Sequence, residues 1–158
     1  MGNSYEEFSV RYNSQWDAVF AVAKWLHSFA GTEVTINPRQ LRQKNQKPED
    51  FYDAGDIKII ANGVVKIVEV KHDQKHDFTT EDEYPFPNIA LANKNSFERN
   101  ADAISVYVRV SKSLTHAFVM PASHKDQWKL EKKWMTNTEQ HEDLYLCPKE
   151  FATIHKIG

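Results

Sequence analysis

The sequence predicts an α/β or α+β domain, in which helices flank a mixed sheet of about five strands. Three observations support this fold class. The first third of the chain has apolar residues at helical spacing, two apolar segments joined by Asn62-Gly63 have the form of a β-hairpin, and β-branched segments follow it. The 158 residues are most simply one compact domain, because single domains commonly fall near that size.

The N-terminal third is expected to be mainly helical. Ser4-x-x-Glu7 and Ser14-x-x-Asp17 both have the form of a capping box. The second box precedes apolar residues that recur at helical spacing, namely Trp16, Val19, Phe20, Ala23 and Leu26. A helix starting close to Ser14 and ending near Gly31 is therefore predicted.

Further elements are predicted on both sides of the hairpin. Segments rich in Val, Ile, Thr and aromatic residues indicate strands at 33–37, 102–110, 115–121 and 144–147. Residues 123–135 are predicted to form an amphipathic helix, whose apolar members are Trp128, Leu130 and Trp134. Residues 72–88 contain two prolines and many charges, which is typical of a long excursion near a functional element.

The composition limits the function classes. With 20 basic and 22 acidic residues the net charge is −2, so nucleic-acid binding would need local basic patches. No stretch approaches a transmembrane span, and the first residues lack the basic and apolar regions of a secretory signal. The protein is therefore expected to stay inside the cell that makes it. The single Cys147 excludes an intramolecular disulfide and a cysteine cluster for structural zinc.

The register of the hairpin at residues 55–71 can be counted from its turn. Asn62-Gly63 favours a two-residue type I′ turn, because both central residues need positive φ. Counting outward places Asp56 opposite Glu69, with Cβ atoms about 4.5–5.5 Å apart. Lys71, two residues after Glu69, lies on the same face. The opposite face is apolar apart from one lysine and should be covered by a core; its members are Ile57, Ile59, Ala61, Val64, Lys66, Val68 and Val70.

Three charges thus meet at the open end of the hairpin. Two opposed carboxylates repel each other unless a cation or a shared proton intervenes. Oxygen ligands such as Asp56 and Glu69 suit magnesium or manganese, which leave water sites open for a substrate phosphate. Lys71 could polarise an attacking water or stabilise charge developing on phosphorus. The residues form a coherent phosphodiesterase site; the alternative is an exposed strand-end cluster in which Lys71 balances two acids.

These residues resemble the motif of the PD-(D/E)XK nuclease superfamily, which has an aspartate and then Glu-x-Lys on the second arm of a hairpin. Here twelve residues separate Asp56 from Glu69-Val70-Lys71. The segment "NADAISVYVRV", residues 100–110, is similar to the strand that follows the active-site hairpin in phage and restriction-like members. The order of helix, three-stranded antiparallel unit, crossover helix and further strand is similar too. The resemblance spans roughly residues 56–110, and Gly55 stands where proline is usual.

The resemblance implies a restriction-endonuclease-like core and a metal-dependent endonuclease that hydrolyses phosphodiester bonds. Asp56 and Glu69 would bind Mg²⁺ or Mn²⁺, the backbone carbonyl of Val70 would commonly add a ligand, and Lys71 would be the catalytic lysine. By analogy with small members of the superfamily, a place in phage or mobile-element DNA metabolism is expected. A non-catalytic module that binds nucleic acid or protein on the same fold, and an RNA endonuclease, remain alternatives.

Superfamily members often add an acidic residue from the first helix. Glu7 and Asp17 are the candidates here, although the capping-box position of Asp17 is an equally good explanation of that residue. Asp53, three residues before Asp56, is a rival metal ligand, but the hairpin register favours Asp56.

Nucleic acid, with DNA favoured, is the predicted partner, and a homodimer would supply the two sites that cutting both strands requires. Basic runs are candidate contacts to the phosphate backbone, although a solvated helix face would explain them as well. The candidates are Arg39, Arg42, Lys44 and Lys47 before the hairpin, His72 after the motif, and Lys125, Lys129, Lys132 and Lys133 on the predicted late helix. Trp128 and Trp134 could stack on bases, with core packing favoured for at least one of them.

Overall fold

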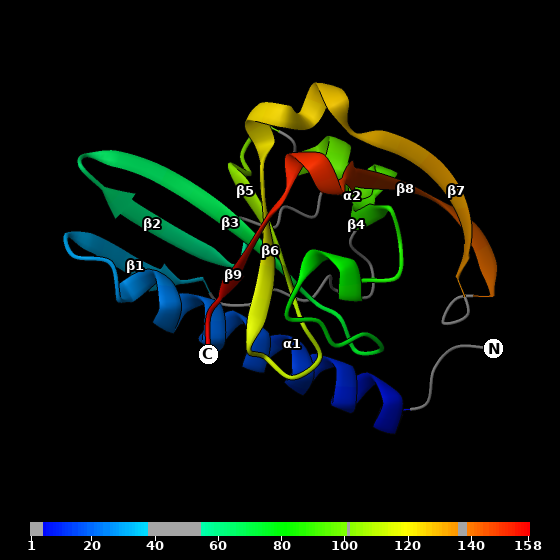
Figure 1. Cartoon of the computed structure of the whole chain (residues 1–158), viewed down its shortest axis with the longest axis horizontal. Helices are drawn as coiled ribbons and strands as arrows, with labels where there is room; N and C mark the ends of the chain where they lie inside the picture. Colours follow the sequence, from blue (N-terminus) through cyan, green and yellow to red (C-terminus); the bar gives the residue numbers. More distant parts are fainter. Residues whose placement is uncertain (1–4, 38–54, 101, 136–138) are drawn as a thin grey trace, which may run out of the picture.

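The computed structural model describes residues 5–37, 55–100, 102–135 and 139–158 (Figure 1). Its main helices are α1 (Tyr5–His27) and α2 (Lys94–Asn100). Its strands are β1 (Thr32–Ile36), β2 (Ile57–Ala61), β3 (Val64–His72), β4 (Asn88–Asn93), β5 (Val106–Val110), β6 (His116–Pro121), β7 (Lys129–Met135), β8 (Gln140–Pro148) and β9 (Thr153–Lys156). Short 3₁₀ turns are η2 (Glu81–Glu83), η3 (Ala122–Gln127) and η4 (Lys149–Phe151). The predicted mixed α+β class is confirmed.

The strands form two sheets. The larger sheet has six strands in the order β1-β2-β3-β5-β6-β9, where sequence analysis predicted about five, and a second sheet has the order β4-β8-β7. In the larger sheet only the β3–β5 pair is parallel among the described pairs. A parallel pair needs a crossover connection. The chain between β3 and β5 provides it, and it contains η2, β4 and α2.

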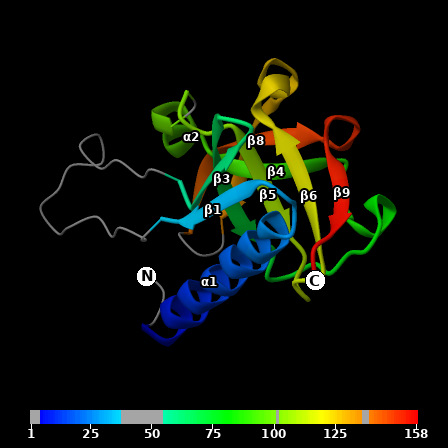
Figure 2. The same ribbon diagram turned by 90° about the vertical axis from the view of Figure 1, so that its left-hand side faces the viewer.

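The helix α1 covers one face of the larger sheet (Figure 2). Its buried side chains include Val19 and Val22, which pack in one cluster with Ile57, Val68 and Val70 of the hairpin. Complete burial of such a side chain stabilises the fold by about 1.5–3 kcal/mol. The apolar face that was predicted for the hairpin is therefore the face beneath α1.

The other face of the larger sheet carries a second, more aromatic core. Phe78 and Phe118 lie at its centre with ring centroids 4.8 Å apart, and Phe97 of α2 stacks on Tyr145 of β8 at 4.2 Å. Cys147 is buried here, and burial raises its pKa to about 11. The second sheet and α2 thus form a layer on the side opposite α1 (Figures 1 and 2).

The prediction of a helix at 123–135 was wrong. Residues 122–127 form η3, and Lys129–Met135 is the strand β7, paired with β8 along its whole length. Leu130 and Trp134 are 46% and 55% exposed, whereas Trp128, before the strand, is buried. This segment is not ordered by an apolar helix face. A seven-residue ladder to β8, the next strand in the chain, supplies its backbone hydrogen bonds.

The start of the first helix was also misplaced. α1 begins at Tyr5 in the described chain, so Ser14 and Asp17 lie within the helix and do not cap it. The Ser14 hydroxyl instead contacts the His72 ring on β3. Within the described residues, no helix is both long enough and apolar enough to cross a lipid bilayer.

Candidate active site

The hairpin has the predicted turn and register. Asn62 and Gly63 both have positive φ, of 52° and 76°, and the pairing runs from Ala61 opposite Val64 to Ile57 opposite Val68. Asp56 immediately precedes β2, and its backbone N–H donates to the carbonyl oxygen of Val68 at 3.1 Å. The ladder of paired residues ends at Ile57, and Asp56 lies beside the segment of β3 that contains Glu69.

The Asp56 side chain is held against the neighbouring strand. It is 7% exposed, and its Oδ2 accepts a hydrogen bond of 2.8 Å from the backbone N–H of Val70. This bond, together with the one from the Asp56 backbone to Val68, fixes the carboxylate beside the part of β3 that contains Glu69.

Gly55 explains why this chain departs from the usual proline before the aspartate. Its φ is +84°, a left-handed conformation that proline cannot adopt because its ring fixes φ near about −65°. An added Cβ would also lie 2.4 Å from Cγ2 of Ile67. Only glycine fits the backbone that delivers Asp56 to this position.

Glu69 and Lys71 share a face of β3, as predicted. The Nζ atom of Lys71 lies 3.4 Å from Oε1 of Glu69, and the two side chains are 39% and 17% exposed. The lysine ammonium therefore balances the negative charge of Glu69. Because the pair is partly open to solvent, Lys71 can reorient toward a ligand at small energetic expense.

The parallel neighbour β5 adds two residues to this face that sequence analysis did not identify. Tyr107 pairs with Glu69, and Arg109 pairs with Lys71. The signal that could have indicated them is the alternation of a tyrosine and an arginine with valines in "VYVRV", because residues two apart along one strand lie on the same face. Burial, followed by the charge of Glu69, raises the pKa of Tyr107, so its hydroxyl stays protonated.

Arg109 ties this face to the excursion that follows β3. Its Nε donates to Oδ2 of Asp73 at 3.1 Å, and its Nη1 donates to the carbonyl oxygen of Ala90 at 3.4 Å. Asp73 is 2% exposed and also accepts hydrogen bonds from the backbone N–H groups of Lys75 and His76. Burial raises the pKa of Asp73, but the Arg109 charge and these N–H groups outweigh it, and the net direction is downward.

The carbonyl oxygen of Val70 accepts a hydrogen bond of 2.5 Å from Nε2 of Gln15 in α1.

His72 lies on the α1 face of β3, where Nδ1 contacts Ser14 and Nε2 lies 3.2 Å from the carbonyl oxygen of Lys112. The structure therefore places His72 on the face opposite Glu69 and Lys71. Asp17 is exposed on α1, which covers that opposite face, so the structure does not bring it to the two carboxylates.

Several predicted residues lie elsewhere or outside the described chain. The side chain of Glu7 in α1, and Arg39, Arg42, Lys44, Lys47 and Asp53, are outside the described residues. Lys129, Lys132 and Lys133 lie on the strand β7, not on a helix, and Nζ of Lys133 lies 5.4 Å from the centre of the Phe86 ring. Lys125, in η3, has its Nζ 3.8 Å from Oδ1 of Asp102.

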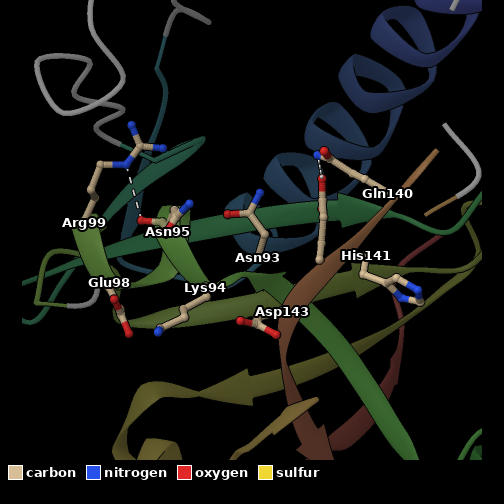
Figure 3. A pocket seen from close by; sticks show the side chains of 9 residues that line it. Asn93, Lys94, Asn95, Glu98, Arg99, Gln140, His141 and Asp143 are labelled. Atoms are coloured by element: carbon tan, nitrogen blue, oxygen red, sulfur yellow. Dashed lines mark hydrogen bonds between the residues drawn. The ribbon is translucent and has the colours of Figure 1, made fainter. Parts of the chain in front are cut away.

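A polar cleft of about 870 Å³ opens between α2 and β8 (Figure 3). Its lining is rich in amides and in charges of both signs, contributed by Asn93, Lys94, Asn95, Glu98, Arg99, Gln140, His141, Glu142 and Asp143. Glu69 lies at a much smaller cavity, shared with Ala92, Ser96 and Asn100 of β4 and α2. The helix α2 therefore contributes to both the cleft and the surroundings of Glu69.

The donor atoms at this face fit a magnesium-type ion better than zinc. Within the described ranges, no cluster of three or more His, Cys, Asp or Glu side chains is placed to hold a metal. Mg²⁺ is usually bound through one or two carboxylates and keeps several waters. Two carboxylates, those of Asp56 and Glu69 on neighbouring parts of the hairpin, match that number of ligands. The Val70 carbonyl could join them, since a carbonyl oxygen has a second lone pair beside the one that accepts from Gln15.

Comparisons with known proteins do not identify a family for this chain. No protein-family model and no curated protein matches the chain. A solved structure of a bacterial homing endonuclease, I-Ssp6803I, aligns with 93% of this chain and 77% of its own, at 15% identity and a TM-score of 0.38.

Proposed function

We propose that this protein is a divalent-metal-dependent endonuclease that hydrolyses phosphodiester bonds in DNA. The observation that supports the proposal is the position of Asp56, which hydrogen-bonds to the backbone of Val68 and Val70 on either side of Glu69, together with the contact between Lys71 and Glu69. In the alternative, an exposed strand-end cluster, the only requirement is that Lys71 balances the charge of the two acids. Here one of the carboxylates is also 7% exposed and fixed by a backbone hydrogen bond, which is expected of a prearranged ligand.

Each residue has a defined role in this proposal. Asp56 and Glu69 would hold Mg²⁺ or Mn²⁺, with the Val70 carbonyl as a further ligand. The bound ion would supply an activated water and would polarise the scissile phosphate. Lys71 would orient the attacking water and stabilise the negative charge that develops on phosphorus. Its exposure of 39% lets its ammonium approach a phosphate while the carboxylates stay in place.

Cleavage assays with matched lysine variants test the proposal. Wild-type protein, Lys71→Ala and Glu69→Gln are incubated with single-stranded, duplex and branched DNA, with Mg²⁺, with Mn²⁺ or with a chelator. Lys58→Ala is the control, because Lys58 is an exposed lysine of the same hairpin face, opposite Ile67. We expect metal-dependent cleavage by wild type and Lys58→Ala only. Intact DNA throughout, or equal cutting by all variants, would refute the assignment.

The finer parts of the proposal need separate measurements. Closed circular DNA distinguishes an endonuclease from an exonuclease, because a circle offers no end, and RNA substrates run in parallel test the alternative nucleic acid. Titration of the protein with Mn²⁺ by calorimetry separates a nuclease from a pure binding module, which has no use for a divalent ion at Asp56 and Glu69. The mass in solution, measured beside the cleavage pattern, tests whether a homodimer provides two sites.

A further inference from the structure

A small cavity lies beside Glu69, between α2 and the larger sheet. Its volume is about 10 Å³, which is close to the space that one water molecule needs. Four polar side chains line it, Glu69 from β3, Ser96 and Asn100 from α2, and Tyr107 from β5. Two to four polar partners are what an ordered internal water requires, and the cavity is too small for anything larger.

Asn100 provides independent evidence for a ligand in this cavity. Its Oδ1 atom is buried and has no hydrogen-bond partner within the described part of the chain. A buried acceptor without a partner is unfavourable, and such atoms in native proteins are usually satisfied by ordered water. Asn100 is the last residue of α2, and its side chain lies at the cavity wall.

Tyr107 supplies a fixed hydrogen-bond donor. The residue is 3% exposed, and its ring contacts Phe97 and Trp128 at centroid distances of 6.0 and 5.5 Å. It pairs with Glu69 across the parallel strands, so both side chains lie on one face. A phenol hydroxyl has one proton to donate, and Tyr107 lines the same cavity as Glu69.

We infer that the cavity binds one ordered water, and that this water and Tyr107 position the Glu69 carboxylate. The water donates one hydrogen bond to Oδ1 of Asn100 and one to Glu69, and it accepts from the hydroxyls of Tyr107 and Ser96. All four of its hydrogen-bonding positions are then used. The role of this network in metal binding rests on the proposed function, since it treats Glu69 as a metal ligand; the water site itself does not.

The consequence for metal binding can be stated as a fold-change. Residues that orient a metal ligand through a hydrogen bond typically change metal affinity about 10–100-fold when replaced. Tyr107 is accordingly a positioning residue that acts through Glu69. Since α2 also lines the polar cleft, a ligand that shifts α2 would change the water network and with it the orientation of Glu69.

A pair of tyrosine variants tests the positioning role. Tyr107→Phe removes the hydroxyl and keeps the ring that packs on Phe97. Tyr145→Phe is the control, because Tyr145 also stacks on Phe97 and its hydroxyl donates to Glu98, at 3.4 Å, on the same helix. Mn²⁺ affinity of the full chain is measured by calorimetry, together with the melting temperature. We expect Tyr107→Phe to bind Mn²⁺ at least about 10-fold more weakly and Tyr145→Phe to match wild type.

The outcomes separate this inference from the proposed function. Equal Mn²⁺ affinity for wild type and Tyr107→Phe would overturn the positioning role, even if Tyr107→Phe melts at a lower temperature. Wild-type protein that takes up no Mn²⁺ would overturn the proposed metal site and the positioning role together. A high-resolution crystal structure of the metal-free protein decides the water site in every case. A water within hydrogen-bond distance of Asn100, Tyr107 and Glu69 supports it, and a cavity that holds none refutes it.

Discussion

Replacing Asp56 with alanine and with asparagine should separate its contribution to folding from its proposed role in binding metal. The alanine variant leaves the buried N–H of Val70 without the 2.8 Å acceptor that it has in the native protein. A buried donor left unsatisfied costs about 1–3 kcal/mol. At about 2–4 °C per kcal/mol for a chain of this length, Asp56→Ala should melt about 2–12 °C below wild type.

Asparagine retains an oxygen that can accept from Val70, and it removes the charge that opposes Glu69. The hydrogen bond weakens because its acceptor is neutral, while the like-charge repulsion is relieved. We therefore expect Asp56→Asn to stay within about 1 kcal/mol of wild-type stability without metal. Both variants should lose Mn²⁺ affinity. Thermal unfolding by circular dichroism and Mn²⁺ calorimetry measure the two effects; equal melting temperatures for the two variants would refute the role assigned to the Val70 hydrogen bond.

Three further substitutions have distinct expected outcomes. Lys71→Ala should lower the free energy of unfolding by less than about 1 kcal/mol, because the Lys71–Glu69 ion pair is partly exposed. The same variant should cleave DNA at least about 100-fold more slowly in a metal-dependent assay. Gly55→Ala should lower the melting temperature and weaken Mn²⁺ binding, because its Cβ would overlap Ile67 and displace the aspartate that follows. Asp73→Asn should cost about 3 kcal/mol by leaving Arg109 without its carboxylate. The pKa of Asp73 in the folded state is lowered, so its contribution to stability is present above its ordinary pKa of 3.8 and is lost as the pH falls from there through the lowered pKa. The difference in melting temperature between Asp73→Asn and wild type should therefore shrink as the pH falls below 3.8.

The parts of the fold that local sequence determines were predicted well. The Asn62-Gly63 turn and the alternation around it define the hairpin without reference to the rest of the chain. Residues 129–135 were misread, because Leu130 and Trp134 can be placed on a helix face while their actual conformation depends on pairing with β8. Sequence analysis did not identify the short elements β4 and α2 from their residues, because β4 is a run of six residues without alternation and α2 has one apolar residue, Phe97.

The residues of the candidate site likewise divide into those that local sequence could place and those that it could not. Asp56 lies beyond the paired residues of the hairpin, next to Val68 and Val70, but Glu69 and Lys71 could be placed on one face of β3 by counting from one turn. Tyr107 and Arg109 could not, because their position depends on how the crossover returns β5 beside β3. His72 was grouped with the basic contacts from its place in the sequence, yet the alternation of side chains along β3 puts it under α1.

The layer opposite α1 has consequences for how such a site would recognise its substrate. The hairpin supplies the two carboxylates and the lysine, which in the proposed reaction hold the ion and act on the phosphate. These groups do not by themselves distinguish one nucleic-acid sequence or shape from another. The crossover and the second sheet supply the cleft, the helix α2 beside Glu69, and Asp73, which pairs with Arg109 of β5. Substitutions in the cleft, such as Asn95→Ala, should therefore change which nucleic acid is cut while leaving Mn²⁺ affinity unchanged; a parallel loss of both would show that α2 serves only to support the hairpin.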